Sequence, residues 1–312
     1  GILMDNYDII VIGAGPAGYI SAIRCAQLGM KTACVDDRIG KQGEPVLGGT
    51  CLNVGCIPSK SLLESSALYE KIRDGAAEHG IVTCEVTHDV GAMVANKDRI
   101  VQDLTGGIET LFRSNGVKWL QGRGQLLPGR QVRVTRHDGS VQTLDAANVI
   151  LATGSAPMAI DAAPLEGDLI VDSSGALDWT DVPQRLGIIG AGVIGLELGS
   201  VWRRLGSSVT LLEAQDIFLS MADHQIARAA LATFRRQGLD IRLSALVKHT
   251  AIDGDVVIIG QGGGSGTQGD GILMTAAEAT GKKESRIRCP VIMGDSAPSR
   301  SLTGRGQRTG HS

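Results

Sequence analysis

The chain has 312 residues, of which 43% are apolar and 20% charged, and its formal net charge is −3. This composition is typical of a soluble globular protein long enough for two domains, and it excludes disorder, collagen and coiled coil as the main state. The sequence predicts no membrane span and no signal peptide, and the near-neutral charge gives no reason to expect a nucleic-acid partner.

A glycine-rich turn follows the first predicted strand. Asp8 begins an apolar run that leads into the pattern G-x-G-x-x-G, and residues 19–28 then predict a helix that ends at Gly29. A second strand over 31–35 ends at Asp36. The N–H groups of such a turn bind a pyrophosphate, and the acid accepts bonds from a ribose. The sequence therefore predicts a dinucleotide site at Gly13, Gly15, Pro16, Ala17, Gly18 and Asp36.

Cys51 and Cys56 lie in a glycine-marked segment, G-G-T-C-L-N-V-G-C-I-P-S-K. Five residues of ideal helix rise about 7.5 Å, more than the usual Cα separation of a disulfide, so a bridge needs a distorted turn that Gly55 permits. Pro58 suits the first turn of a helix over 59–72, whose positive end stabilises a thiolate at Cys56. The segment is typical of a reversible dithiol; two reduced packing cysteines are the alternative.

The other cysteines give no sign of a metal site. Cys25 and Cys34 fall within the first predicted helix and strand as small apolar residues, and Cys84 and Cys289 are isolated. The sequence lacks paired C-x-x-C units and clustered histidines. We expect these four cysteines to be structural and the protein to bind no metal.

Residues 131–144 have the pattern of a hairpin. The strand 131–135 alternates in polarity, His-Asp-Gly-Ser at 137–140 is typical of a tight turn, and 141–144 returns. An apolar strand over 149–152 follows. We expect a small antiparallel layer between two nucleotide-binding halves.

The first glycine turn is repeated later in the chain. Gly190 and Glu213 stand 177 residues after Gly13 and Asp36, each within the same strand–turn–helix–strand context. A lone G-x-G-x-x-G is weak evidence, but its recurrence in this context predicts a second dinucleotide site. A carboxylate at Glu213 suits a free ribose 2′-hydroxyl and repels a 2′-phosphate, which favours NAD over NADP. We interpret the arginines at 203–204 as solvated surface residues.

These motifs together resemble the flavin-dependent pyridine nucleotide-disulphide oxidoreductases. The run G-G-T-C-x-N-V-G-C-x-P-S-K after G-x-G-P-x-G carries the resemblance, and Ser59, Glu213 and the run from Gly190 to Gly206 are most similar to the dihydrolipoamide dehydrogenases. Glutathione reductases, which have a second lysine in place of Ser59, and mercuric reductases are the alternatives. The resemblance covers about residues 5–250 and implies two doubly wound α/β domains, with an NAD domain inserted into an FAD domain.

The resemblance also implies roles for single residues. Lys60 stabilises electron density arriving on the flavin, Glu197 pairs with Lys60, and Cys51 and Cys56 form the redox disulfide. The implied FAD contacts are Gly13, Gly15, Pro16, Ala17, Gly18, Asp36, Gly49, Thr50, Cys51, Lys60, Gly124, Thr153, Gly154 and Ser155. The implied NAD contacts are Gly190, Gly192, Val193, Ile194, Gly195, Glu197, Glu213 and Val247.

The implied reaction is the oxidation of protein-bound dihydrolipoamide to lipoamide, with NAD as acceptor, through the disulfide and FAD. The family implies lipoyl domains and the core of a 2-oxo acid dehydrogenase complex as partners, a homodimer, and a location in a bacterial cytoplasm rather than a mitochondrial matrix. A non-catalytic fragment that binds flavin or nucleotide is the alternative from another functional class.

The sequence departs from the family pattern after residue 250. Residues 251–312 contain 13 glycines and no aromatic residue, which predicts a disordered tail. We hypothesise that the natural reading frame was lost near 251. Met-Gly-Asp at 293–295 resembles the family's late FAD motif only by coincidence in our interpretation. We find neither the family's His-x-x-x-x-Glu base nor its interface domain in the sequence. The expected divisions are an FAD domain over 1–155, an incomplete NAD domain over 156–250 and the tail, with little or no lipoamide turnover.

Overall fold

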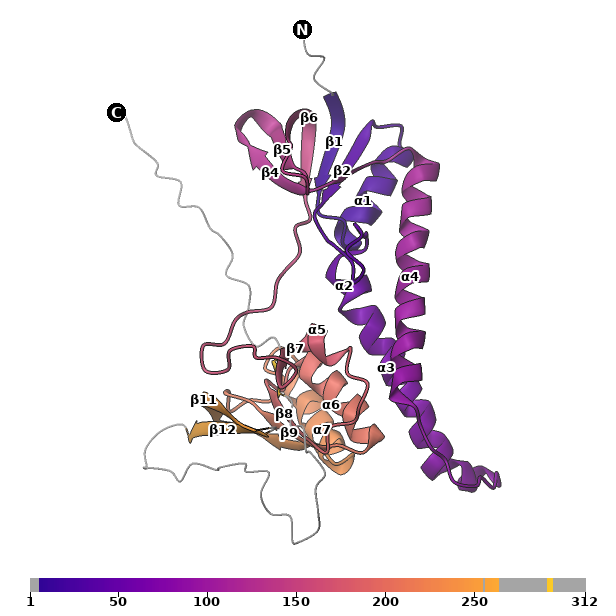
Figure 1. Cartoon of the computed structure of the whole chain (residues 1–312), viewed down its shortest axis with the longest axis vertical. Helices are drawn as coiled ribbons and strands as arrows, with labels where there is room; N and C mark the ends of the chain where they lie inside the picture. Colours follow the sequence, from indigo (N-terminus) through magenta and orange to yellow (C-terminus); the bar gives the residue numbers. More distant parts are fainter. Residues whose placement is uncertain (1–5, 255, 264–290, 294–312) are drawn as a thin grey trace.

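The computed structural model of the chain describes residues 6–254, 256–263 and 291–293. These residues form two α/β units, each built on a sheet with parallel strands at its centre (Figure 1). The first unit runs from β1 to β6 and the second from β7 to β13. The prediction of two doubly wound α/β domains is confirmed.

The first unit contains a six-stranded sheet with the order β3-β2-β1-β6-β5-β4. Strands β3, β2, β1 and β6 are parallel, and β5 and β4 continue the sheet antiparallel. The elements are β1 (Asn6–Ile12), α1 (Pro16–Gln27), β2 (Thr32–Asp36), α2 (Gly49–Asn53), α3 (Cys56–Glu70), the π-helical η1 (Lys71–Gly75), the 3₁₀ turns η2 (Ala76–His79) and η3 (Pro128–Arg130), α4 (Val90–Asn115), β3 (Lys118–Gln121), β4 (Arg123–Leu127), β5 (Gln131–Thr135) and β6 (Val141–Leu151).

The expected separate antiparallel layer is wrong. The returning strand does not stop at Leu144 but continues as β6 to Leu151. Its first half pairs with β5 and its second half pairs with β1, so the hairpin is an extension of the nucleotide-binding sheet. The residues between the two halves, Asp-Ala-Ala-Asn, contain no glycine or proline that would end the strand.

The second unit contains a five-stranded parallel sheet with the order β10-β9-β8-β13-β7 and an antiparallel hairpin of β11 and β12. Its elements are β7 (Ile170–Asp172), α5 (Ser173–Ala176), β8 (Arg185–Ile189), α6 (Val193–Leu205), β9 (Ser208–Leu212), α7 (His224–Arg236), β10 (Asp240–Arg242), β11 (Ala245–Asp253), β12 (Val256–Gly263) and β13 (Val291–Met293).

The tail predicted to be disordered from residue 251 contains strands. Residues 256–263 form β12 against β11, and 291–293 form β13 between β7 and β8. β12 pairs with one neighbour in a two-stranded hairpin and β13 pairs with two neighbours in the parallel sheet, so backbone groups of both segments find hydrogen-bond partners that their glycine content did not suggest. The rest of that prediction, together with Cys289, Gly294 and Asp295, lies outside the described residues.

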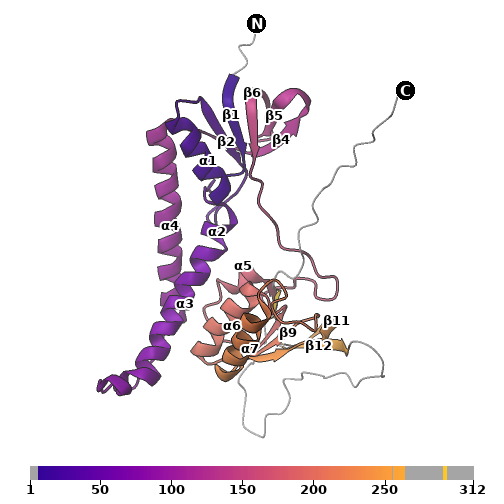
Figure 2. The same cartoon turned by 180° about the vertical axis from the view of Figure 1, so that it is seen from behind.

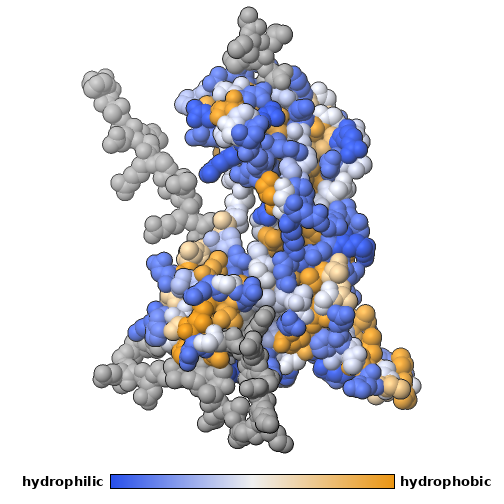
Figure 3. Space-filling model, in the orientation of Figure 1, coloured by the Kyte–Doolittle hydropathy of each residue, from blue (hydrophilic) through white to orange (hydrophobic). Residues whose placement is uncertain are grey.

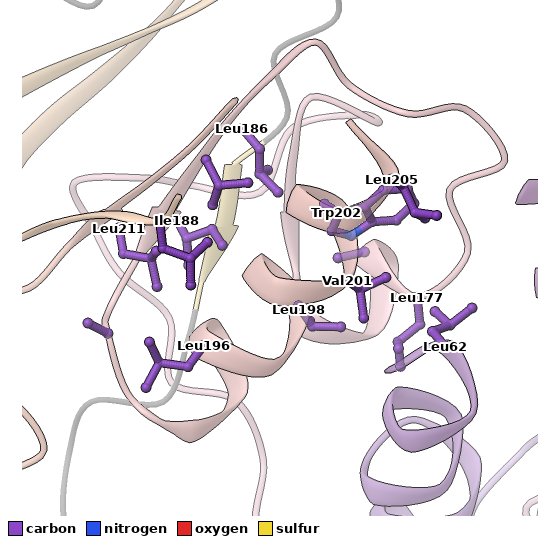
Figure 4. Close-up of a cluster of buried hydrophobic side chains, with 14 of the residues drawn as sticks. Leu62, Leu177, Leu186, Ile188, Leu196, Leu198, Val201, Trp202, Leu205 and Leu211 are labelled. Carbon is purple, nitrogen blue, oxygen red and sulfur yellow. The ribbon is translucent and has the colours of Figure 1, made fainter. Parts of the chain in front are cut away.

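Helix α3 joins the two units. It starts at Cys56, with Pro58 in its first turn as expected, and runs alongside α6 of the second unit, as Figure 2 shows from behind. In Figure 4 its Leu62 points toward Leu177 and Val201 of the second unit, and all three belong to one buried cluster. Burying a leucine side chain contributes roughly 1.5–3 kcal/mol, so α3 helps to fix one unit against the other.

The two arginines of α6 bind other segments, contrary to the interpretation as solvated residues, and Arg204 takes part in the contact with α3. Arg204 Nε lies 3.3 Å from Glu70 Oε2, and Arg204 also donates to the carbonyl of Leu63. Arg203 Nε donates to the carbonyl of Gly238. Both long side chains therefore bind backbone or acid groups of other segments.

Beyond this contact, α3 and α4 form an arm whose free end carries exposed apolar residues (Figure 3). Ile72, Ile81 and Val82 are among them. Within the described part of the chain, no helix combines the length and the apolar character needed to cross a membrane.

Candidate active site

The first glycine turn is held by its own acid. Ala14 N donates to Asp36 Oδ2 at 2.6 Å, and Arg38 N donates to Asp36 Oδ1 at 2.9 Å. A Cβ at Gly18 would lie 1.8 Å from the carbonyl oxygen of Gly13, so only glycine lets α1 pack this closely on the turn. Among the described residues no side chain caps the start of α1, which leaves N–H groups available for a phosphate.

The second glycine turn repeats these hydrogen bonds at the same offset of 177 residues. Ala191 N donates to Glu213 Oε2 at 2.9 Å, and Gln215 N donates to Glu213 Oε1 at 3.0 Å. A Cβ at Gly195 would lie 2.3 Å from the carbonyl oxygen of Gly190. The sequence pattern assigned both acids to a ribose, and the structure shows that each also fixes the shape of its turn.

A cavity of about 880 Å³ lies between the two units. It is lined by predicted FAD-site residues of the first unit and by the start of α6 from the second unit. The predicted site residues in its wall are Gly13, Gly15, Pro16, Asp36, Gly49, Thr50, Cys51, Cys56, Lys60, Thr153, Gly154, Ser155, Val193, Ile194 and Glu197. The structure therefore brings the first turn, the cysteine pair and the N-terminal end of α6 to one space.

Eight predicted residues are not among those described in the cavity wall: Ala17, Gly18, Gly124, Gly190, Gly192, Gly195, Glu213 and Val247. Most of these belong to the two turns and act through backbone geometry. Gly124 packs against Ile12 and Val35, where a Cβ would lie 3.0 Å from the Ile12 side chain. Val247 is buried in a cluster with Val257. For these two residues a direct cofactor contact stays a prediction.

The cysteine pair is formed by a break between α2 and α3. A Cβ at Gly55 would lie 3.0 Å from the Cα of Cys51 and 2.9 Å from the carbonyl oxygen of Thr50, so glycine is required where the chain reverses. Both cysteines are thiols, with Cys56 exposed in the first turn of α3 and Cys51 half-buried. Burial and the hydrogen bond with Cys56 raise the pKa of the Cys51 thiol, so its neutral form is favoured.

Lys60 and Glu197 form the expected ion pair across the two units. Lys60 Nζ lies 2.6 Å from Glu197 Oε1, with the lysine side chain more exposed than the carboxylate. The adjacent Ser59 donates to Glu197 Oε2 at 2.9 Å. The sequence predicted no contact for Ser59. Its hydrogen bond to Glu197 joins positions 138 residues apart, which no local pattern reveals.

Arg38 and Asp172 are among the cavity residues that the sequence did not predict. Arg38 lines the cavity beside Asp36 and donates to Thr50 Oγ1 at 3.1 Å, and Asp172 reaches the wall from the start of α5. The position of Arg38, two residues after the turn's acid, was the available signal. Among the described residues, no group of three His, Cys, Asp or Glu side chains is arranged to hold a metal ion.

A family model described as pyridine nucleotide-disulphide oxidoreductase matches residues 7–282. The chain belongs to this family. The match continues past residue 251, so the family pattern extends further than the expected 250.

Two of three curated relatives of this pyridine nucleotide-disulphide oxidoreductase are named dihydrolipoyl dehydrogenase. It is 48% identical to dihydrolipoyl dehydrogenase of Cupriavidus necator over 79% of the chain and 52% of that protein. It is 39% identical to leghemoglobin reductase of Vigna unguiculata over 93% of the chain and 51% of that protein. Mitochondrial dihydrolipoyl dehydrogenase of Dictyostelium discoideum is 41% identical over 87% of the chain and 56% of that protein. The chain thus spans about half the length of these relatives.

Solved structures show the same fold. The HOCl-induced flavoprotein disulfide reductase RclA from Escherichia coli, in a Cu(II) complex, is similar with a TM-score of 0.71 at 23% identity, over 94% of this chain and 57% of that one. At this identity the likeness concerns the fold alone.

The residues of the cavity fit the cofactors that the family implies, FAD and NAD. The turn at Gly13 offers uncapped N–H groups to a pyrophosphate, and Asp36 lines the cavity with a spare lone pair on each oxygen. Gly49 and Gly15 lie in close contact, since a Cβ at Gly49 would be 2.5 Å from the Gly15 Cα. Because neither residue has a side chain, this part of the cavity wall leaves room for a flat group. The start of α6 supplies the corresponding place for the nicotinamide nucleotide.

Proposed function

We propose that this protein oxidises dihydrolipoyl groups to lipoyl groups, with NAD as the final acceptor. One observation carries the proposal: the thiols of Cys51 and Cys56 share a cavity with the Lys60–Glu197 ion pair, the first glycine turn and the start of α6. A thiol pair between two nucleotide turns is the arrangement that a dithiol-to-nucleotide electron transfer requires. The 48% identity to a dihydrolipoyl dehydrogenase favours this substrate over glutathione or mercuric ion.

Gly13, Asp36, Thr50 and Lys60 of the cavity wall would hold FAD, which would supply a two-electron carrier between the cysteines and NAD. The chain's own chemistry is thiol–disulfide exchange. A substrate thiolate attacks Sγ of Cys51 in the oxidised pair, the bond between the two sulfurs breaks, and Cys56 leaves as a thiolate. The second substrate thiol then attacks the mixed disulfide, which releases a cyclic disulfide and returns Cys51 as a thiol.

Lys60 and Glu197 provide the electrostatic setting for this exchange. The Lys60 ammonium stands in the cavity wall near Cys56 and compensates negative charge that arrives there. The start of Cys56's own helix adds a partial positive charge on the side of the leaving thiolate. Both groups stabilise the negative charge on Cys56 as it leaves the disulfide.

We infer NAD rather than NADP as acceptor and a role in a larger assembly. A carboxylate at the end of β9 repels a 2′-phosphate, which supports NAD. The substrate is then the lipoyl domain of a 2-oxo acid dehydrogenase complex, the protein acts as a homodimer, and the higher identity to the Cupriavidus relative than to the Dictyostelium one favours a bacterial cytoplasm.

Turnover of dihydrolipoamide tests the proposal. After incubation with FAD, the chain is expected to reduce NAD with dihydrolipoamide only slowly, in keeping with the departure from the family pattern late in the sequence. Cys51→Ser and Cys56→Ser are each expected to lower this rate at least about a hundredfold because each removes half of the exchange. Cys84→Ser, which changes an exposed cysteine outside the cavity, is the matched control. Activity that survives Cys51→Ser, or a chain that binds both nucleotides without any thiol-dependent reaction, contradicts the proposal; the second result identifies a non-catalytic nucleotide-binding protein.

A further inference from the structure

Ser59 is a buried residue at the junction of the two units. Its Oγ donates to Glu197 Oε2 at 2.9 Å, while Lys60 Nζ binds the other oxygen, Oε1, at 2.6 Å. The two partners are neighbours on α3, and the carboxylate they share comes from α6. Each oxygen of Glu197 therefore has one partner of its own.

The two partners hold the carboxylate with different strength. The Lys60 side chain is 56% exposed, and an ion pair at such a site is screened by water and costs side-chain entropy. Ser59 is only 8% exposed, so its hydrogen bond to a charged acceptor is shielded and forms through a short side chain with little entropy to lose. Ser59 is therefore the firmer of the two attachment points.

Ser59 also links the carboxylate to the start of the cysteine helix. Its hydroxyl has a single proton and a second acceptor within reach, the carbonyl oxygen of Cys56 at 3.3 Å. The contact with Glu197 is shorter, and its acceptor is charged, so the proton favours the carboxylate. The same hydroxyl thus lies against the first turn of α3 and orients an acid on α6.

We propose that Ser59 is a positioning residue, whose hydroxyl fixes the Glu197 carboxylate and, through it, the Lys60 ammonium in the cavity wall beside Cys56. A neutral donor does this without adding charge, so Lys60 and Glu197 together remain electrically balanced. The catalytic value of this position rests on the proposed function, whereas the positioning itself does not.

The packing of α3 on α6 does not depend on Ser59. Arg204 at the other end of α6 binds Glu70 and the carbonyl of Leu63, and Leu62 is buried between the units. Alanine is also a better helix former than serine. Ser59→Ala should therefore fold normally and remove only the hydrogen bond that positions the Glu197 carboxylate.

Zero-length cross-linking measures the positioning directly. A water-soluble carbodiimide activates a carboxylate and joins it to an amine in contact with it, with loss of water, so the yield of Lys60–Glu197 peptide amide reports how often the ion pair is formed. We expect this yield, measured by mass spectrometry after proteolysis, to fall at least about tenfold in Ser59→Ala, in line with the loss of a hydrogen bond to a charged group. Ser59→Thr keeps the hydroxyl and should restore most of the cross-linking yield.

Ser66→Ala is the matched control. Ser66 is buried on the same helix, and its Oγ donates to the carbonyl of Leu63 in that helix, so its removal should leave the cross-link unchanged. A yield in Ser59→Ala equal to that of the unchanged chain overturns the positioning role, and so does a Ser59→Thr yield as low as that of Ser59→Ala. A chain that cross-links as expected but does not oxidise dihydrolipoamide contradicts the proposed function alone.

Discussion

The two cysteines of the cavity differ in exposure, and this sets how each reacts. Cys56 is exposed at the start of α3, while burial and the contact with Cys56 raise the pKa of the Cys51 thiol. Because the thiolate is the reactive form, a raised pKa lowers the thiolate fraction of Cys51 at neutral pH. In the reduced protein, Cys51 is therefore a slower nucleophile than an ordinary exposed thiol.

We expect the pH profile of Cys51 alkylation by iodoacetamide to have its midpoint above the ordinary thiol value of about 8.5. Cys56→Ala removes the side-chain hydrogen bond and leaves burial, so it should move the midpoint part of the way back. Peptide mass spectrometry of the reduced chain at a series of pH values gives both profiles, with free glutathione as reference. A midpoint for Cys51 at or below that of glutathione would show that this environment does not disfavour the thiolate.

The glycine turns show what an element can reveal before a structure is known. Both turns, their helices and their terminal acids were predicted because strand, turn and helix follow one another within about thirty residues, although α1 begins at Pro16 and not at 19. The same local reasoning divided β6 into two strands, since the partners that make it continuous, β1 and β5, lie elsewhere in the chain. Sequence pattern thus located the elements and missed pairings made over a distance.

Two glycines inside helices provide a matched test of the first turn. A Cβ at Gly18 of α1 would lie 1.8 Å from the carbonyl oxygen of Gly13, whereas a Cβ at Gly107 of α4 meets no described atom within 4 Å. Gly18→Ala should lower the free energy of unfolding by roughly 2 kcal/mol through overpacking. Gly107→Ala should raise it by up to about 1 kcal/mol, as expected for alanine in an open helix.

Urea unfolding followed by circular dichroism measures both changes, and FAD binding should weaken only in Gly18→Ala. If Gly18→Ala is as stable as Gly107→Ala, the close contact of α1 with the first turn does not exist in solution. The repeat offers an independent check, since Gly195→Ala should resemble Gly18→Ala in the second unit.

At the scale of the whole molecule, a cluster of four charges connects the units away from the cavity. Lys97 of α4 is only 2% exposed, and its Nζ lies 2.7 Å from Asp178 Oδ1 and 2.9 Å from Asp98 Oδ1. Lys41 binds the same two acids. Burial disfavours the charged form of Asp98, but the hydrogen bonds from both lysines outweigh it and lower its pKa. No part of this cluster was predicted, because its members come from three separate segments.

Asp178→Ala should destabilise the protein by roughly 2 kcal/mol, because it leaves the buried Lys97 ammonium with one carboxylate that Lys41 also binds. Asp103→Ala removes an exposed i,i+4 partner of Arg99 and should change stability by no more than about 0.5 kcal/mol. Equilibrium urea denaturation of the two variants makes the comparison. Equal stabilities would mean that the cluster does not fasten the units together.

The central claim is that one cavity holds a flavin against the thiols of Cys51 and Cys56. The visible absorption spectrum of the FAD-incubated chain, recorded before and after anaerobic addition of dihydrolipoamide, tests it most directly. We predict a protein-bound flavin spectrum that gains a long-wavelength charge-transfer band on reduction, and loss of that band in Cys56→Ser. A colourless protein, or a bound flavin whose spectrum does not respond to the dithiol, would contradict the account.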